Sequence, residues 1–175
     1  MARACLNTEQ IMVRIFVIAA ASASVLMFSP TVFAQEPAQY GNADQAKAML
    51  AKAVSAVKAD KTKALDMFNK GEGGFLDRGL YPFCWNVSDG KHVATRAKQL
   101  LGQDVRILRD PTGKAFGLEL YAAAKEGQTT EVSYMFPRPV ADTTPGQNVS
   151  FATPGQKVTF VTRAGDLGCG VGYFK

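Results

Sequence analysis

The first 34 residues constrain the fold of this chain most, because they have the layout of a secretory signal. Arg3 and Arg14 precede an apolar run from Ile15 to Phe28, and Val32 and Ala34 stand at the −3 and −1 positions of a cleavage site. The run is about 14 residues long, short of the ~20 that span a bilayer. We expect cleavage after Ala34 and export to the periplasm or the medium; an uncleaved membrane anchor is the alternative.

The chain beyond this segment has the size of one domain. Cleavage after Ala34 would leave 141 of the 175 residues, an ordinary length for a single domain. A true start at Met12 would still leave a signal of typical length. No second long apolar run follows, so we expect no membrane span in the mature chain. Residues 35–42 are expected to be a mobile start, and residues 43–175 a single domain.

The composition argues against most catalytic and metal sites. The chain is 47% apolar and 20% charged, which is typical of a globular protein, and its 20 basic against 15 acidic residues do not indicate a nucleic-acid partner. His92 is its one histidine, and the sequence has neither a CxxC nor a GxSxG motif. We therefore expect no enzyme activity, no metal and no cofactor.

Export changes the meaning of the cysteines. Cys84 and Cys169 are the two that follow the signal segment, and in an oxidising compartment they can pair. The residues alone do not exclude the alternative that both are buried free thiols.

The periodicity of the sequence predicts helices first and an antiparallel sheet after them. An apolar stripe of helical spacing begins at Ala43 and restarts after Asp60-Lys61, and Gly71 is placed to end it. The further expected elements are strands at Tyr81–Val87, His92–Thr95, Thr129–Phe136, Lys157–Arg163 and Gly168–Phe174, with a short helix from Phe116. Helices that segregate from an antiparallel sheet define the α+β class.

Two kinds of turn are expected between these elements. Asp89-Gly90 has the residues of a tight hairpin turn. Thr144-Pro-Gly-Gln is echoed nine residues later by Thr153-Pro-Gly-Gln, and Pro-Gly favours a turn at both places.

An ordered set of short motifs resembles the single-Cache domain family, whose fold is similar to that of PAS domains. The set comprises Gly74-Phe75 with Asp77, Leu80-Tyr81-x-Phe83, Asp89-Gly90, Leu101–Val105, Asp110-x-x-Gly113-Lys114-x-Phe116, Tyr134–Pro139 and Gly168-x-Gly170-Val-Gly172-Tyr173. The resemblance covers most of residues 43–175. It implies a long N-terminal helix beside a central antiparallel sheet of about five strands, with a small-molecule pocket on one sheet face.

The resemblance also implies a function and a cysteine pairing. Cache domains are extracytoplasmic sensors of small metabolites, so we expect a non-catalytic domain that binds a short organic acid, with a membrane sensor kinase or chemoreceptor as its partner. The first and last strands are neighbours in this fold, which favours a Cys84–Cys169 disulfide. Phe136 and Thr95 stand where the family often has Trp and His, so the ligand itself cannot be carried over. An envelope interaction module with a degenerate pocket is the alternative function.

A pocket for an organic acid needs aromatic walls and a cation. The candidate walls are Tyr81, Trp85, Tyr121, Tyr134 and Phe136, and the candidate anion-binding residues are Arg96, Arg106, Arg138 and Lys157. Arg138 and Arg96 are preferred, since Arg138 lies in the rigid Phe-Pro-Arg-Pro segment. The simpler reading makes the aromatic residues core and the cations solvated surface. His92 could make binding sensitive to pH.

Overall fold

The computed structural model describes residues 40–139 and 151–175. The predicted signal and the start of the predicted mobile segment lie outside these residues. The chain divides into two units, Met1–Gln35 and Glu36–Lys175, and only the second contains described residues. No described helix is both long and apolar enough to cross a membrane.

Two consecutive helices open the domain. Helix α1 (Ala43–Ala59) begins with a capping box, in which the Asn42 side chain accepts from the Gln45 backbone N–H and the Gln45 side chain accepts from the Asn42 backbone N–H. Asp60 ends α1 in an extended conformation and caps α2 (Lys61–Lys70). Gly71 ends α2 at a φ of 74°, as its position predicts.

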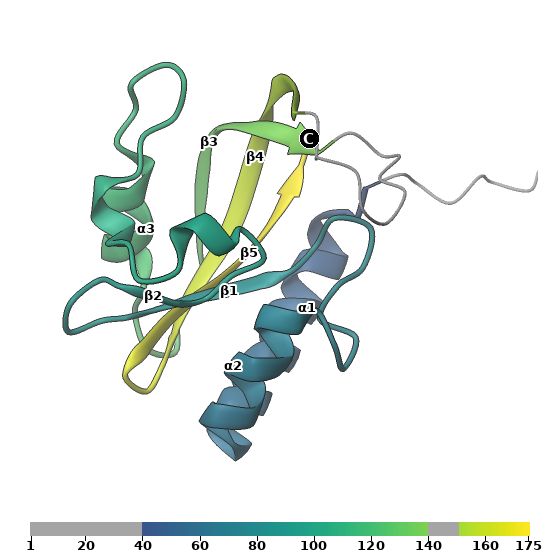
Figure 1. Ribbon diagram of the computed structural model, residues 1–175, viewed down its shortest axis with the longest axis vertical. Helices are drawn as coiled ribbons and strands as arrows, with labels where there is room; N and C mark the ends of the chain where they lie inside the picture. The colour runs from purple at the N-terminus through teal and green to yellow at the C-terminus, as the bar shows by residue number, and fades with distance from the viewer. Residues whose placement is uncertain (1–39, 140–150) are drawn as a thin grey trace, which may run out of the picture. The chain divides into compact units, whose positions relative to one another are not determined.

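The described residues that follow contain one antiparallel sheet of five strands (Figure 1). Its elements are β1 (Pro82–Asn86), β2 (His92–Ala94), α3 (Phe116–Ala123), β3 (Thr130–Pro139), β4 (Phe151–Ala164) and β5 (Leu167–Phe174), with the 3-10 helices η1 (Lys98–Leu100) and η2 (Val105–Ile107) between β2 and α3. The strand order is β2-β1-β5-β4-β3, so the last strand lies between the first and the fourth. The expected α+β class and strand pattern are confirmed.

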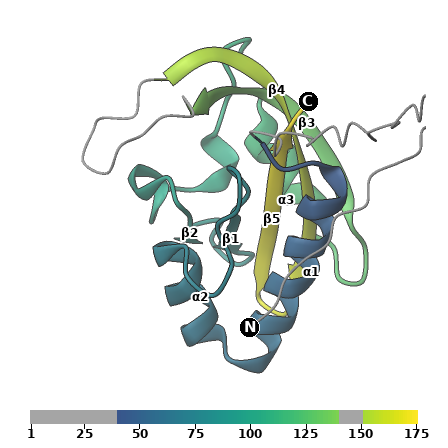
Figure 2. The ribbon, with the colours of Figure 1, turned by 90° about the vertical axis from the view of Figure 1, so that its right-hand side faces the viewer.

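The helices cover the two faces of the sheet unequally. Figure 2 shows α1 and α2 on one face, where Leu50, Phe68 and Phe160 belong to one apolar core. A second core lies on the opposite face under α3 and contains Trp85, Leu120 and Val161. Because side chains alternate along a strand, neighbouring residues of β1, β4 and β5 supply both cores.

A disulfide joins Cys84 to Cys169, the pairing that the resemblance implies. The two residues face each other in the register of β1 and β5, and their Cα atoms are 4.1 Å apart. Both are fully buried on the side of α1 and α2. The disulfide therefore links strands that are 85 residues apart in the sequence.

One expected turn is a strand. Thr153–Gln156 lies inside β4, where Gly155 pairs with Phe136 and Pro154 with Pro137. The pairing of β5 with β4 reaches only to Lys157, so Pro154 lies where β4 has no partner on that side and needs no ladder N–H. The matching Thr144–Gln147 lies outside the described residues.

Asp110 covers the free edge of the sheet at β3. Its carboxylate accepts hydrogen bonds from the backbone N–H groups of Thr112, Lys114 and Met135 and from the Thr112 hydroxyl. These bonds, led by that of Thr112, hold the pKa of Asp110 at about 2. The Met135 bond satisfies an edge N–H that would otherwise be open to another strand.

Replacement of Asp110 by Asn should destabilise the domain in a pH-dependent way. A carboxylate whose pKa is depressed on folding stabilises the fold above its unfolded pKa of about 3.9, and this contribution is lost as the pH falls toward 2. The stability difference between the wild type and D110N in urea unfolding should therefore be full at pH 7 and shrink between about pH 4 and pH 2. A difference that stays constant with pH would contradict this role.

Candidate functional site

Three alternating glycines shape the sheet face under α3. Gly168, Gly170 and Gly172 of β5 share this face, so the strand places no side chain on it at these positions. A Cβ at Gly168 would lie 2.5 Å from the Trp85 ring, and one at Gly170 would lie 2.9 Å from the Phe83 ring. Because these positions have no side chains, large side chains of the neighbouring strands can lie across β5.

The side chain of Lys157 lies over Gly172, the last of these glycines. A Cβ at Gly172 would lie 2.5 Å from Cε of Lys157 and 2.5 Å from Oγ1 of Thr159. The stem of Lys157 thus runs over Gly172, and its Nζ lies 5.1 Å from the centroid of the Tyr81 ring near β1.

Substitution of Gly172 by Ala should displace the Lys157 ammonium. We expect a loss of about 1–3 kcal/mol in the free energy of unfolding, as for other overpacked sites, and a weaker response to any anion bound at Lys157. G168A is the control, because its Cβ would meet the Trp85 ring but not Lys157. Denaturant unfolding and calorimetric titration measure the two effects; equal anion affinity in both variants would rule out this positioning role.

Lys157 faces a small cavity between the sheet and the segment from β2 to α3. The cavity has a volume of about 30 Å³. It is lined by Tyr81, Phe83, His92, Thr95, Ala97, Leu100, Leu108, Phe116, Tyr134, Phe136 and Lys157. Most of this wall is apolar or aromatic, so the ammonium is its one side chain with a full charge at neutral pH.

Lys157 is a buried cation without a described counter-ion. It is 4% exposed, and no ion pair between described residues includes it. Its Nζ lies 4.7 Å from the centroid of the Phe136 ring and 5.2 Å from that of Phe174. Burial lowers the pKa of Lys157, but its interactions with the Tyr81 and Tyr134 hydroxyl groups, a hydrogen bond with Tyr81 among them, raise the pKa by more, so it lies above its ordinary value. Lys157 is therefore charged at neutral pH.

Stacking and hydrogen bonds fix a part of the cavity wall around Lys157. The Tyr134 ring stacks on Phe116 at 4.0 Å, and the Tyr134 and Thr159 hydroxyls are 2.9 Å apart. Nδ1 of His92 lies 3.1 Å from the Gln103 carbonyl oxygen, which can only accept, so this nitrogen carries the proton. Burial lowers the pKa of His92 and keeps the ring neutral at pH 7.

The structure brings four of the predicted site residues together and leaves Trp85 apart from them. Tyr81, Tyr134, Phe136 and Lys157 line the cavity. Trp85 is fully buried in the core under α3, stacked on Phe83, and does not line the cavity.

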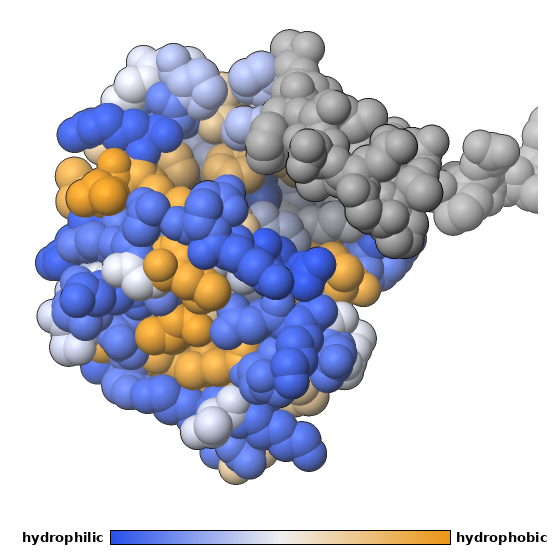
Figure 3. Space-filling model, viewed as in Figure 1, coloured by the Kyte–Doolittle hydropathy of each residue, from blue (hydrophilic) through white to orange (hydrophobic). Residues whose placement is uncertain are grey.

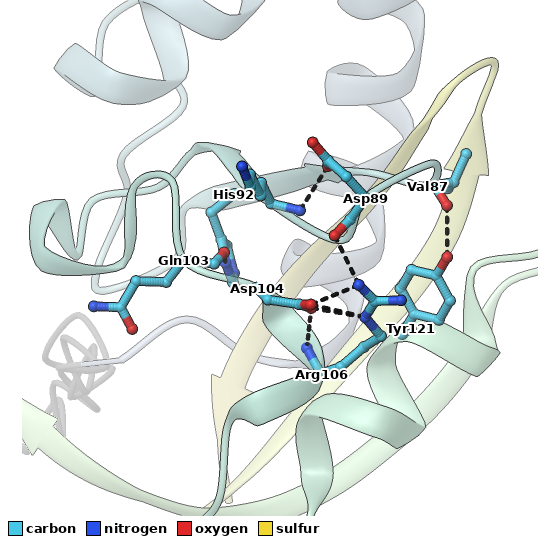
Figure 4. A network of polar contacts seen from close by, with 8 residues as sticks. Val87, Asp89, His92, Gln103, Asp104, Arg106 and Tyr121 are labelled. Carbon is cyan, nitrogen blue, oxygen red and sulfur yellow. Dashed lines mark hydrogen bonds and ion pairs between the residues drawn. The ribbon is translucent and has the colours of Figure 1, made fainter.

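Tyr121 and Arg106 hold the β1–β2 hairpin instead (Figure 4). Arg106 forms an ion pair with Asp104 and donates to the Asp89 carbonyl. The Tyr121 hydroxyl donates to the Val87 carbonyl, and the Arg106 guanidinium lies 5.0 Å from the centroid of the Tyr121 ring. Both side chains are therefore engaged away from the cavity.

The two preferred arginines also lie elsewhere. Arg96 is exposed and donates to the carbonyls of Asn69 and Lys70 at the end of α2. Arg138 donates to the Lys175 carbonyl and lies 5.4 Å from the centroid of the Phe174 ring. Neither lines the cavity.

From the sequence we prefer Arg138 and Arg96 to Lys157, although the sequence also contains a signal for Lys157. Lys157, Thr159 and Val161 alternate in β4 toward the same face as the glycines of β5. A lysine on a strand face that is otherwise apolar or small is unusual, and that pattern distinguishes it from the candidate arginines.

A larger open groove of about 690 Å³ lies between α1 and the β3–β4 part of the sheet. Its charged side chains, such as Lys47, Lys58 and Glu126, are exposed, and Lys58 lies 4.0 Å from Glu126. Exposed pairs of this kind bind anions weakly because water screens them. The cavity at Lys157 is therefore the better candidate site.

Comparison with known proteins reveals a shared fold. No protein-family model matches the chain, and no curated protein matches it in sequence. Among solved structures, a methyl-accepting chemotaxis protein from Vibrio parahaemolyticus is similar with a TM-score of 0.56 and 18% identity, over 75% of this chain and 86% of that one.

Two other structures are similar over 75% of this chain. One is described as the periplasmic sensor domain of a chemotaxis protein, with a TM-score of 0.50, 21% identity and 88% of its own length covered. The other is a Cache chemosensory domain described for carboxylic acid recognition, with a TM-score of 0.51, 20% identity and 86% of its length covered.

The chain therefore has a Cache-type, PAS-like fold, as the motifs of its sequence predict. All three neighbours are described as chemotaxis or chemosensory proteins.

Proposed function

We propose that this protein is an extracytoplasmic sensory domain that binds a small carboxylate in the cavity at Lys157. The observation that carries the proposal is the buried ammonium of Lys157, which has aromatic neighbours and no described counter-ion. A buried charge is costly unless it is paired. A carboxylate guest would supply a counter-ion for this ammonium.

The fold supports a role in signalling rather than in chemistry. One structural neighbour is described for carboxylic acid recognition, and another is a periplasmic sensor domain. The predicted export of the chain would place it in the same compartment. The domain would then present its bound state to a membrane sensor kinase or chemoreceptor.

The cavity must widen to admit a guest. Its volume of about 30 Å³ is the room of roughly one water molecule. Acetate needs more space than this, so binding must move side chains of the wall. The fixed part of the site is the Lys157–Tyr134–Thr159 group on the sheet, and the adjustable part is the covering segment.

Replacement of Lys157 by Met tests this function directly. Short organic acids should raise the melting temperature of the purified wild-type protein, because a ligand at 100 times its dissociation constant adds about 2.7 kcal/mol of stability. K157M keeps the length and apolar stem of the side chain but removes the charge, so this shift should disappear. K63M is the matched control, since Lys63 is exposed on α2.

The small cavity also favours a second candidate function, an envelope interaction module with a filled pocket. Apolar side chains reach the surface on the face drawn in Figure 3, and Ile107 and Leu118 are 62% and 51% exposed. A wild-type protein that no short acid stabilises would favour this function. An acid-induced shift that K157M retains in full would remove Lys157 from the site.

A further inference from the structure

The cavity at Lys157 adjoins a second, open cavity of about 480 Å³. Four side chains line both spaces: Leu100, Leu108, Phe116 and Phe136. We call these four residues the partition. Because one layer of side chains separates the two spaces, a guest that moves part of the partition would occupy both.

The two spaces differ in polarity: the cavity at Lys157 holds a charge, and the second cavity is mainly apolar. The cavity at Lys157 contains the ammonium, whereas the partition is wholly apolar. The open cavity adds the apolar side chains of Pro111, Met135 and Pro137. Asp110 also lines it, but its carboxylate already accepts the hydrogen bonds of its own turn and of β3.

A negative group is therefore favoured at Lys157 and disfavoured beside Asp110. Arg109 and Gln99, the other polar residues of the open cavity, are exposed. They face water and leave the interior of the open cavity apolar.

The partition has a fixed side and an adjustable side. Phe116 is buried and stacked on Tyr134, which is itself hydrogen-bonded to Thr159. Leu100 ends a three-residue 3-10 helix that has no side-chain cap, and Leu108 directly follows a three-residue 3-10 helix that is capped by Asp104. Both leucines are half-buried. Short 3-10 segments of this kind rearrange more easily than strands and helices with full hydrogen-bond ladders.

We propose that the ligand is a monocarboxylate with an apolar body, whose carboxylate binds Lys157 and whose body passes between Leu100 and Leu108 into the open cavity. This inference rests on the proposed function and narrows the class of its ligand. It predicts that apolar monocarboxylic acids bind more tightly than small polar organic acids that carry a second charged group.

A chain-length series tests the inference. Calorimetric titration of the wild-type protein with unbranched acids from acetate to octanoate should show affinity rising about fourfold for each added methylene, as expected for burial of a CH₂ group. Octanedioate, with a second carboxylate at its far end, should bind more weakly than octanoate. Octanol, which lacks the charge, should bind far more weakly than octanoate.

Adjacent leucines provide a matched pair of variants. L100Q places an amide in the partition, so it should flatten the dependence of affinity on chain length. L101Q makes the same change one residue later, at a side chain that is 41% exposed and lines neither cavity. L101Q should therefore retain the full dependence of affinity on chain length.

The outcomes separate the inference from the function on which it rests. If acids bind but affinity does not rise with length, or octanedioate binds as tightly as octanoate, the inference is wrong and the carboxylate site stands. If L101Q flattens the series as much as L100Q, the body does not lie at the partition. If no acid binds at all, the proposed function fails and the inference fails with it.

Discussion

Removal of the Cys84–Cys169 disulfide should lower the free energy of unfolding by about 4 kcal/mol, which follows from the entropy of closing a loop of this length. The loop spans 85 residues, and it ties β1 to β5 at the centre of the sheet. In a domain of this size the melting temperature should fall by roughly 10–15 °C. The variant is the double substitution C84A/C169A, because a serine hydroxyl at these fully buried positions would lack a partner.

Reductant provides the control for this prediction. The wild-type protein treated with a reducing agent should unfold like C84A/C169A, and the variant should be indifferent to the reagent. Both proteins can be compared by thermal unfolding followed by circular dichroism. A wild-type melting temperature that does not change on reduction would show that the disulfide contributes no stability.

Substitution of Trp85 by Ala should cost about 3–5 kcal/mol, the range for a large aromatic side chain removed from a core. Trp85 is fully buried, lies over Gly168 and stacks on Phe83 at 5.9 Å. Its indole Nε1 has no hydrogen-bond partner among the described residues. W85F retains a ring and removes that unsatisfied N–H, so it should lose much less stability than W85A.

The two Trp85 variants also separate a core role from a ligand role. W85F should respond to short acids as the wild type does, because Trp85 does not line the cavity at Lys157. Denaturant unfolding measures the loss of stability, and calorimetric titration measures the affinity. A W85F protein of normal stability that no longer binds acids would place Trp85 in the site.

Local patterns in the sequence predict most of the secondary structure because their causes lie within a few residues. The capping box at Asn42 and the left-handed Gly71 are decided by neighbouring backbone groups. The hairpin at Asp89-Gly90 depends on a positive φ at Gly90. Pro154-Gly155 has the same turn chemistry, yet it lies in β4, since pairing with β3 outweighs the local preference.

The set of residues that line the cavity cannot be predicted from local sequence patterns. Aromatic and cationic residues can be found in the sequence, but which of them share a space depends on how strands far apart in the chain pair. Trp85 and Tyr81 face the same side of the sheet near or within β1, and only the fold places one under α3 and the other at the cavity. Arg138 and Arg96 are engaged by backbone carbonyls contributed by remote segments.

By itself the sequence determined the α+β class, the order of helices and strands and the resemblance to Cache domains, since these follow from periodicity, turn residues and ordered motifs. Tertiary structure alone decided that Lys157 is the buried cation of the cavity. That outcome requires β5 to lie between β1 and β4 with Gly172 under the lysine stem. The physical reason is that burial of a charge depends on what surrounds it in space, and here those neighbours come from strands distant in the chain.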